Sequence, residues 1–403
     1  MHTVMVVFGT RPEAIKVAPV IKALRDDWRF DTVAVATAQH RHMLDQVIKI
    51  FDIVPDVDLD MLTPRQTLGG LTQRLLAELV PLVSSRRPDM VVVQGDTTTA
   101  FAASLAAYYN RIPVAHLEAG LRTGDIWSPY PEEANRRLIA CLTALHLAPT
   151  AAAAANLRAE TTPAHRVIVT GNTVIDALLW AVANPCGYGD QALDYLHRHT
   201  GPVLLVTAHR RESWGLPLQQ VATALADLAE TEPGLRIVLP LHRNPVVREA
   251  LLPRIGGYPN ITVVEPLEYA GFCQLMNRSD LILTDSGGVQ EEGPSLGKPV
   301  LVMRDTTERP EGVEAGAARL VGTDPAVIVP EVRALLHDPV VYRRMAGAIN
   351  PYGDGRAAER VIAALAHFFG SGSPPEPFVA DRVSIPARVK LAASRAERWV
   401  GRR

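Results

Sequence analysis

Residues 284–311 hold the densest group of side chains and glycines that could bind a phosphorylated ligand. Segment 285–288 places two glycines where a predicted strand turns into a helix, so that backbone N–H groups can close around an anion. Glu291 and Glu292 fall one turn into that helix, where a carboxylate repels phosphate but accepts hydrogen bonds from a ribose diol. Arg309 follows the next predicted strand and adds a guanidinium. The Ser-Gly-Gly tripeptide alone is more typical of an ordinary turn, but an anion cradle, a diol acceptor and a cation together indicate a sugar nucleotide.

Further polar groups that could bind a ligand or transfer protons follow other predicted strands. They are Arg11, Asp96, Glu118, His209 and His242, joined by Glu132 and Glu133 from the loop 128–133. Open α/β sheets bind ligands at the carboxyl ends of their strands, so this clustering favours a functional interpretation. Three carboxylates and a histidine in a closed cleft can supply a general acid and a general base with separated pKa values.

Structural interpretations compete for several polar residues taken one at a time. Asp96 precedes Thr97 and is a good candidate for a helix N-cap. Asp125 is typical of a turn, and His116 lies inside an apolar strand, which favours a buried histidine of the core. The sequence contains no Ser-His-Asp signature, no metal-ligand spacing, no P-loop and no GxGxxG fingerprint, so neither a metal nor a nicotinamide cofactor is indicated.

Apolar strands alternate with helices along most of the chain, which predicts mainly parallel sheets covered on both faces. The predicted strands are residues 4–8, 33–37, 90–93, 114–117, 144–148, 167–169, 203–207, 237–240, 261–264, 281–283 and 300–303. The predicted helices are residues 14–24, 43–51, 67–84, 97–109, 218–229, 246–252 and 269–276, with a short helix after Gly288. A turn-rich break at 184–190 separates two similar halves. We therefore expect an α/β fold with two Rossmann-like domains, 1–183 and 190–369, whose strand ends face each other across a cleft.

The segment 370–403 differs in composition from the rest of the chain. Residues 371–375 are linker-like, and basic residues outnumber acidic ones over 382–403. Trp399 and Val400 could share one helix face with two other apolar side chains. Because that face is small, a solvated or self-docked appendage is favoured over a membrane anchor, and we expect a linker and a flexible basic tail.

The composition of the 403-residue chain is that of a soluble globular protein, with 47% hydrophobic and 21% charged residues. The formal net charge of −2 provides no basic field that would attract nucleic acid or a membrane. Three isolated cysteines fit a reducing compartment and form no metal or redox motif. No signal peptide and no apolar run long enough to span a bilayer are visible, so we expect a cytoplasmic enzyme.

Nine segments form an ordered set of motifs along the chain. They are FGTRPEAIK (8–16), TAQHR (37–41), GDTTT (95–99), EAGLRTGD (118–125), SPYPEEANR (128–136), TGNTVIDAL (170–178), TAHRRES (207–213), TDSGGVQEE (284–292) and RDTTERPEG (304–312). In register from about residue 3 to 369, they resemble the non-hydrolysing UDP-N-acetylglucosamine 2-epimerases. The resemblance implies a GT-B-like fold, no cofactor, a homodimer and a role in polysaccharide biosynthesis. It also implies reversible conversion of UDP-N-acetylglucosamine to UDP-N-acetylmannosamine, by elimination of UDP to 2-acetamidoglucal and re-addition of UDP with the opposite configuration at C2.

The resemblance assigns roles to residues that match the motifs of the family. The catalytic group is Asp96, Glu118, Glu132 and His209, with the two glutamates as candidates for proton transfer. The nucleotide-binding positions are Arg11, Lys16, Phe272, Ser286, Gly287, Gly288, Glu292 and Arg309. Among these, Phe272 would stack near uracil and Glu292 would accept a hydrogen bond from ribose.

The family often binds a second UDP-N-acetylglucosamine beside the active site as an activator. The matching positions are Gln39, Arg65, Glu132, Arg210 and His242. His42 and Leu267 stand where some members have glutamine, which puts local contacts in doubt without changing the main interpretation.

Other functions stay open from the sequence. One is a hydrolysing relative that releases N-acetylmannosamine and UDP, and another is a glycosyltransferase on the same architecture. No acceptor-site motif favours the glycosyltransferase, and no sugar-kinase segment indicates a fused bifunctional enzyme. A non-catalytic sensor of UDP-sugars could keep the nucleotide residues but would not need Asp96, Glu118 and Glu132, which are all present.

Overall fold

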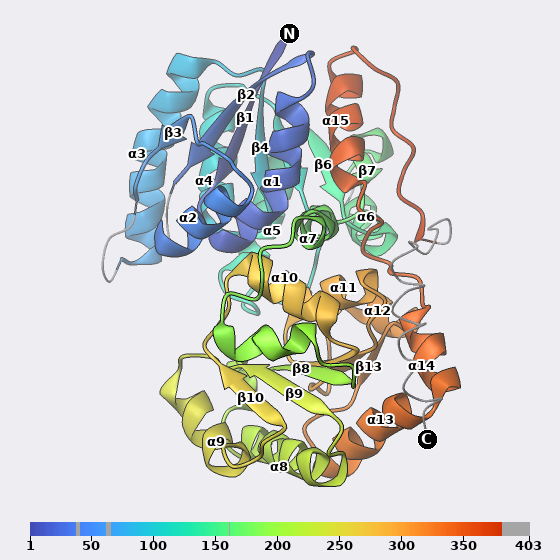
Figure 1. The fold of residues 1–403 in the computed structure, drawn as a ribbon. Coiled ribbons are helices and arrows are strands. Elements are labelled where there is room, and N and C mark those ends of the chain that lie inside the picture. The colour runs from blue at the N-terminus through green and yellow to red at the C-terminus, as the bar shows by residue number, and fades with distance from the viewer. Residues whose placement is uncertain (38–40, 62–65, 161, 381–403) are drawn as a thin grey trace. The chain divides into compact units, whose positions relative to one another are not determined.

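The computed structural model describes residues 1–37, 41–61, 66–160 and 162–380 (Figure 1). Within these ranges the chain forms two compact units. The first is built from residues 1–177 together with 352–379, and the second from residues 178–351. Both units are open α/β sheets, as the alternation of strands and helices predicts.

The first unit is organised around a seven-stranded sheet in the order β3-β2-β1-β4-β5-β6-β7. All the strand pairs are parallel. Because these strands run in the same direction, their carboxyl ends all lie at one edge of the sheet. The strands are β1 (His2–Phe8), β2 (Phe30–Ala36), β3 (Val57–Asp58), β4 (Met90–Gln94), β5 (Val114–Leu117), β6 (Leu145–Ala148) and β7 (Val167–Val169).

Helices cover both faces of this sheet, since β1 and β4 are buried on both sides. Leu71, Leu75 and Leu79 of α3 pack with strand side chains such as Met5 and Val91 in one core cluster. Figure 1 shows α1 and α3 on opposite sides of the strands. The helices are α1 (Arg11–Arg25), α2 (Arg41–Ile50), α3 (Leu68–Arg86), α4 (Thr98–Tyr109), α5 (Glu132–Leu142), α6 (Ala151–Ala159) and α15 (Ala357–Phe368), with a 3-10 turn η1 (Ala164–Arg166). Helix α7 (Thr173–Ala183) begins in this unit and ends in the second.

Threonine residues start four of these helices. Each one stands at the N-cap, and its hydroxyl accepts a hydrogen bond from the amide three residues later. They are Thr10, Thr67, Thr97 and Thr150. At α1 the cap is a complete capping box, because the Glu13 carboxylate accepts from the Thr10 amide in return.

The second unit holds a six-stranded parallel sheet in the order β10-β9-β8-β11-β12-β13. The strands are β8 (Val203–Thr207), β9 (Arg236–Pro240), β10 (Ile261–Val264), β11 (Leu281–Thr284), β12 (Val300–Val302) and β13 (Ala318–Leu320). A large core cluster joins this sheet to α8 and α9, with Leu225, Leu228 and Leu251 among its buried members. Figure 1 shows α8 and α9 on one side of the strands and α10 and α11 on the other.

Asparagine or aspartate followed by proline starts three helices of this unit. The caps are Asn244, Asp324 and Asp338, and each is followed by a proline at the first helical position. The helices are α8 (Leu216–Thr231), α9 (Pro245–Ile255), α10 (Tyr269–Arg278), α11 (Gly287–Ser295), α12 (Pro310–Glu314), α13 (Pro325–His337) and α14 (Pro339–Ala346), with 3-10 turns η2 (Gln191–His197) and η3 (Arg211–Ser213).

The elements predicted from the sequence are present, with ends that agree within three residues. The structure adds the short strands β3 and β13 and the helices α5, α6, α7, α12, α13, α14 and α15, which the sequence patterns had not indicated. One detail is wrong: Thr97, not Asp96, caps α4, because the Asp96 side chain is bound elsewhere.

The division between the units differs from the predicted limits of 1–183 and 190–369. Residues 352–369, expected in the second domain, belong with the first unit. The amides of Ala357 and Ala358 at the start of α15 donate to the carboxylate of Asp176 on α7, at 3.2 and 2.8 Å. Helix α15 also packs against α1. These contacts attach the helix to the first sheet although it follows the second in sequence.

Residues 371–379 are not an independent linker, contrary to the sequence-based expectation. The Phe378 side chain is buried, and its amide donates to the carbonyl of Val169 at the end of β7 (2.8 Å). The Arg360 guanidinium lies over the Phe378 ring, 5.4 Å from its centre. This one aromatic anchor, which composition does not reveal, fastens the segment to the first unit. The predicted basic tail, 381–403, lies outside the described residues.

Two histidines lie opposite each other on neighbouring strands of the first sheet. His116 on β5 is paired in register with His146 on β6, and both are buried. Burial lowers the pKa of His116 to about 4 and that of His146 to about 3. Both rings are therefore neutral near pH 7, which confirms His116 as a core residue.

None of the helices in the described part of the chain combines the length and the apolar character needed to cross a lipid bilayer.

The buried histidine pair predicts an acid-sensitive first unit. The unfolded chain takes up a proton on each ring below about pH 6.5, whereas the folded chain does not until about pH 4 or 3. The contribution of each ring to the free energy of unfolding is thus full above pH 6.5. It falls with decreasing pH by about 1.4 kcal/mol per pH unit. Asp176, with a pKa raised to about 6, acts in the opposite sense and offsets one ring between about pH 6 and 4. Replacing His146 with Asn should flatten the decline in unfolding free energy between pH 6.5 and 5, while exposed His165→Asn should not. An unchanged slope in His146→Asn would contradict the prediction.

The anchoring of residues 371–379 predicts a stability effect at one side chain. Phe378→Ala should lower the stability of the first unit by about 2–4 kcal/mol, as expected for emptying a buried aromatic site at the periphery. The thermal midpoint should fall by roughly 5–10 °C. Val379→Ala is the matched control, since Val379 is 40% exposed and should change little. Equal midpoints for the two variants in scanning calorimetry would show that the segment contributes no stability.

Candidate active site

The polar residues singled out in the sequence stand at the carboxyl edges of the two sheets. In the first unit Arg11 follows β1, Asp96 follows β4 and Glu118 follows β5. In the second unit His209 follows β8 and His242 follows β9, while residues 285–288 follow β11. Each unit thus presents its own set of groups at the edge where ligands of such sheets bind.

The loop after β1 is fixed by a buried carboxylate. Glu13 accepts hydrogen bonds from the amides of Gly9 and Thr10 at 3.0 and 2.7 Å, and from the Thr97 hydroxyl at 2.6 Å. Burial raises the pKa of Glu13, although all these donors act to lower it. The interaction ties the turn after β1 to the turn after β4. It thereby sets the start of α1, where Arg11 and Lys16 lie.

Glu118 is the most constrained acidic residue of the first unit. Its backbone is left-handed, with φ of 61°, and two residues later Gly120 has φ of 94°. A side chain at Gly120 would collide with the Ala153 carbonyl of α6, 2.2 Å from an ideal Cβ, so only glycine fits this turn. The turn therefore leaves little freedom in where the Glu118 side chain points.

Hydrogen-bond donors surround the Glu118 carboxylate. Lys16 Nζ lies 2.7 Å from Oε1 and 2.6 Å from Oε2. The Gln94 amide donates to Oε2 and the Asn172 amide to Oε1, the latter at 3.4 Å. The side chain of Glu118 is only 7% exposed. An ionised carboxylate needs such partners to be buried, so Lys16, predicted to bind nucleotide, is here the counter-ion of a catalytic candidate.

Asp96 is held by α5. The Arg136 guanidinium binds its carboxylate at 2.7 Å, and the Asn135 amide donates to its backbone carbonyl at 2.8 Å. Arg136 also reaches Glu133, at 3.2 Å. Glu133 is fully buried; burial would raise its pKa, but the Thr123 amide and two arginines hold the pKa below its ordinary value. Glu133, considered together with Glu132 as a candidate in the sequence, therefore has a structural role: it holds the start of α5 and the neighbouring loop together.

Glu132 is the first residue of α5 and differs from its neighbour. It is partly buried, and its Oε2 has no hydrogen-bond partner among the described residues. The turn after β4, which carries Asp96, is contacted by His116, whose Nε2 lies 2.7 Å from the carbonyl of Gly95. A neutral ring with its proton on Nε2 donates to that carbonyl, which supports the turn that carries Asp96.

His209 of the second unit is oriented by a buried aspartate. Asp285 is 1% exposed, and its Oδ1 lies 2.8 Å from Nδ1 of His209. Its Oδ2 accepts from the backbone amides of His209 and Arg210, at 2.7 and 2.8 Å. Burial would raise the pKa of Asp285, but the imidazole and the two amides hold it below its ordinary value. Nδ1 is therefore engaged, and Nε2 is the nitrogen left to act on a ligand.

Arg210 and His242 lie beside this pair. The Arg210 guanidinium is 3.7 Å from Glu308, and an ideal Cβ at Gly287 would be 3.5 Å from its Nη2. The His242 ring stacks on His209 with centroids 6.1 Å apart. Burial and the neighbouring His209 lower the pKa of His242. The second unit thus gathers two imidazoles and a guanidinium beside the start of α11.

Helix α11 begins at the predicted glycine turn. Ser286 is its N-cap residue but makes no side-chain cap, so the first amides of the helix are left without that acceptor. Glu292 is buried, and its Oε1 accepts from the Tyr269 hydroxyl at 3.1 Å. Arg309 forms an ion pair with Glu291 through Nε. The two predicted ligand groups of this segment are therefore fixed by neighbours on α10 and α11.

Phe272 lies on α10 and is partly buried. Gly288 is exposed at the second position of α11, in keeping with an open turn. Gln39 and Arg65, expected at an activator site, lie outside the described residues. In the described ranges no group of three or more His, Cys, Asp or Glu side chains has the arrangement of a metal site.

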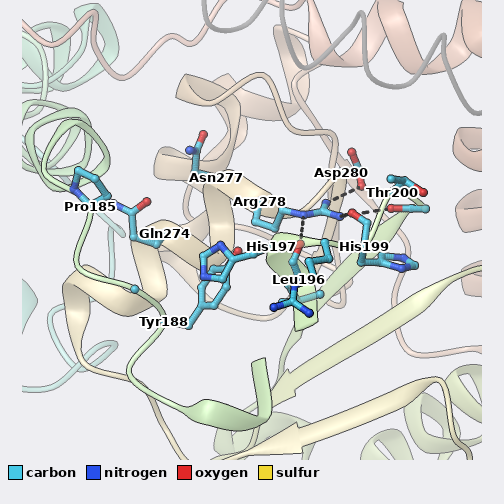
Figure 2. Close-up of a pocket in the computed structure, with 13 residues that line it drawn as sticks. Pro185, Tyr188, Leu196, His197, His199, Thr200, Gln274, Asn277, Arg278 and Asp280 are labelled. Carbon is cyan, nitrogen blue, oxygen red and sulfur yellow. Dashed lines mark hydrogen bonds and ion pairs between the residues drawn. The ribbon is translucent and has the colours of Figure 1, made fainter. Parts of the chain in front are cut away.

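A pocket of about 740 Å³ lies at the other edge of the second sheet (Figure 2). Asp280, which lines it, precedes β11, whereas the glycine turn follows that strand. Arg278 spans one side, donating to the carbonyls of Leu196 and His199 at 3.1 and 2.6 Å and lying 3.5 Å from Asp280. These groups hold η2 and the start of β8 against α10, so the polar lining of the pocket serves the fold.

Sequence reasoning missed several residues that the structure places at the site. They are Gln94, Asn172, Arg136, Asp285 and Tyr269. Gln94 ends β4 and Asp285 follows β11, so the rule applied to Asp96 and Glu118 could have found both. Arg136 and Tyr269 lie within helices, where position along the chain gives no such signal.

The chain is similar in sequence to proteins of a named family. The family model described as UDP-N-acetylglucosamine 2-epimerase matches residues 22–366. The UDP-N-acetylglucosamine 2-epimerase of Escherichia coli K12 is 52% identical over 368 residues, which cover 90% of this chain and 98% of that protein.

Solved structures extend the similarity to the fold. The UDP-GlcNAc 2-epimerase of Neisseria meningitidis, crystallised with UDP-GlcNAc, is 45% identical, with a TM-score of 0.80 over 91% of this chain and 100% of that one. The Methanocaldococcus jannaschii enzyme, in complex with UDP-GlcNAc and UDP, is 31% identical, with a TM-score of 0.73 over 91% and 99%. The fold is accordingly GT-B-like, with a Rossmann-like sheet in each unit. From the matched family model and these relatives, the chain belongs to the UDP-N-acetylglucosamine 2-epimerase family.

Proposed function

We propose that this protein epimerises C2 of UDP-N-acetylglucosamine reversibly, giving UDP-N-acetylmannosamine, without hydrolysing the sugar nucleotide. Relatives of high identity carry the name of this epimerase, and one was crystallised with UDP-GlcNAc. The observation that supports the chemistry best is the Glu118 carboxylate, set on a left-handed turn among an ammonium and two amides. A purely nucleotide-binding protein has no need of such a group.

The proposed reaction has two stages because the hydrogen at C2 is not acidic enough for direct inversion. A base removes the C2 proton while the C1–O bond to UDP breaks, which leaves 2-acetamidoglucal with a double bond between C1 and C2. A terminal phosphate oxygen of UDP then forms a new bond to C1, and an acid delivers a proton to C2 from the opposite face of the sugar. No net oxidation occurs, and both electron pairs return to the bonds they left.

Glu118 and Glu132 are the proposed proton-transfer groups. They come from different elements, the turn after β5 and the first position of α5, which suits transfer on two different faces. Asp96, bound by Arg136, completes the carboxylate group as an electrostatic partner.

The second unit supplies the proposed binding site for UDP. Open amides at the start of α11, with Ser286, Gly287 and Gly288, suit the pyrophosphate. His209, turned by Asp285 so that Nε2 is available, suits the developing charge on the leaving phosphate oxygen. Glu292 and Phe272 are assigned to ribose and uracil, and Arg309 adds a guanidinium to this group.

The proposal also includes an activator site, a homodimer and a role in polysaccharide synthesis. Glu132, Arg210 and His242, with Gln39 and Arg65, would bind a second UDP-N-acetylglucosamine as an activator. We also propose a cytoplasmic homodimer that supplies N-acetylmannosamine units for a polysaccharide. Sedimentation of the purified protein tests the dimer, and a sigmoidal dependence of rate on UDP-N-acetylglucosamine tests the activator.

The elimination route predicts exchange of the C2 hydrogen with solvent. In heavy water, UDP-N-acetylmannosamine should carry deuterium at C2, because a side chain that exchanges with solvent delivers the new proton. Oxygen-18 in the bridge between sugar and phosphate should scramble, because freed UDP can rotate before it adds back. NMR of the products measures both. Protium at C2 with an unscrambled bridge would exclude elimination, and free N-acetylmannosamine without UDP-N-acetylmannosamine would indicate the hydrolysing alternative. Transfer to an added acceptor would indicate a glycosyltransferase.

The assignment of the two glutamates predicts a separation of binding from turnover. Glu118→Gln and Glu132→Gln should each keep UDP affinity within a few-fold and lower kcat by at least ~100-fold, the usual scale for loss of a proton-transfer group. Calorimetry with UDP and a coupled assay measure the two quantities. Exposed Glu314→Gln is the control. Near-normal turnover in both site variants would remove them from the proton-transfer role.

A further inference from the structure

We propose that Gln94 and Asn172 are positioning residues for Glu118, which hold its carboxylate in one orientation and in its ionised form. The inference rests on the proposed function, since it concerns how Glu118 enters the epimerisation. It adds two neutral, buried side chains to a site so far defined by charged ones. Neither amide is expected to touch the sugar nucleotide.

The donors to Glu118 come from three separate places along the sheet edge. Lys16 lies on α1, Gln94 is the last residue of β4, and Asn172 follows β7. Lys16 binds both oxygens, while each amide binds one, Gln94 at Oε2 and Asn172 at Oε1. An ammonium on a four-carbon stem fixes a charge but not a direction, because it can follow the carboxylate as it rotates. Two amides on opposite oxygens do fix the carboxylate plane.

Both amides are themselves immobilised. Gln94 and Asn172 are each 3% exposed. Asn172 Oδ1 accepts from the Val174 amide at 3.1 Å, which caps the start of α7, and its backbone amide donates to the Tyr352 carbonyl at 2.7 Å. Gln94 belongs to a strand paired with β1 and β5. Neither residue can follow the carboxylate if it turns.

The neighbourhood favours a carboxylate over a carboxylic acid. Each named partner of Glu118 donates a hydrogen bond to it, and a donor stabilises the charged form of a carboxyl group. Side chains that titrate or carry charge around this edge include Arg11, Glu13 and Lys16 on α1, Asp96 after β4, His116 on β5, Arg122 after β5 and His146 on β6. The amides cannot titrate, so their effect persists at every pH at which the protein is folded.

The test uses variants that each remove one donor and add no charge. Gln94→Met removes the first amide, and Asn172→Ser removes the second but keeps an oxygen that can cap α7. Each should lower kcat about 10–100-fold, leave UDP affinity within about two-fold, and move the acid limb of the kcat profile to higher pH by about 1 unit or more. Thr143→Val is the matched control, since Thr143 is a buried polar residue directly after α5 whose hydroxyl donates to the Ile139 carbonyl.

A double-mutant cycle separates positioning from general damage. In the Glu118→Gln background, Gln94→Met should lower kcat by less than two-fold, because the carboxylate that it serves is already absent. An equal loss in both backgrounds would show that Gln94 acts only through stability, and a rise in KM with unchanged kcat would show that it binds substrate. Either result would overturn the proposal.

A spectroscopic measurement keeps the inference testable if the proposed function fails. With carbon-13 in glutamate carboxyl groups, the Glu118 resonance is assigned by its loss in Glu118→Gln and followed against pH in the free protein. Its titration should move to higher pH in Gln94→Met and Asn172→Ser but not in Thr143→Val. Unmoved titration curves would overturn the positioning role whatever the activity, whereas moved curves in a protein that does not epimerise UDP-N-acetylglucosamine would overturn only the proposed function.

Discussion

The contact between Lys16 and Glu118 is the interaction on which the chemistry proposed for the first unit depends. A carboxylate that is 7% exposed cannot remain ionised without a cation or several donors, and here an ammonium lies within 2.7 Å of both oxygens. The contact requires the start of α1 and the end of β5 to meet, although 102 residues separate them. The parallel sheet order, with β4 between β1 and β5, brings these two strand ends to the same edge. The arrangement of the other elements follows from keeping that edge intact.

The left-handed backbone at Glu118 shows what this edge requires of the fold. A non-glycine residue in that region costs roughly 1–3 kcal/mol and persists only where its surroundings determine it. Here they do: Gly120 is pressed against α6, the Asn156 amide bonds its carbonyl at 3.0 Å, and β5 is paired on both sides. In the second unit the corresponding carboxylate, Asp285, follows β11 without a left-handed backbone and orients His209. The strain is therefore confined to the unit assigned to proton transfer.

Much of the fold could be predicted from the sequence, and the reasons for the exceptions are physical. Buried parallel strands are short apolar runs, so every strand of the described structure except β3 and β13 was found. Residues 352–369 were expected in the second unit because they follow it in sequence, but the attachment of α15 to the first unit depends on Asp176 accepting from two amides, 181 and 182 positions away. Residues 371–379 resemble a linker in composition, because their attachment depends on Phe378 and on a few hydrogen bonds near Ser371 that composition does not reveal. At the site, position after a strand identified Asp96, Glu118 and His209, whereas the partners on helices could not be found without coordinates.

Glu13 and Glu118 show why burial alone does not determine what a carboxyl group does. Both lie at the same edge of one sheet, and both are almost completely enclosed. Glu13 receives hydrogen bonds from two amides and a hydroxyl, all neutral, and burial still raises its pKa. Glu118 receives an ammonium as well as amides. Neutral donors alone therefore suit Glu13, which connects two turns. The added charge of Lys16 suits the proposed role of Glu118, which would give and take a proton while its side chain stays in one position.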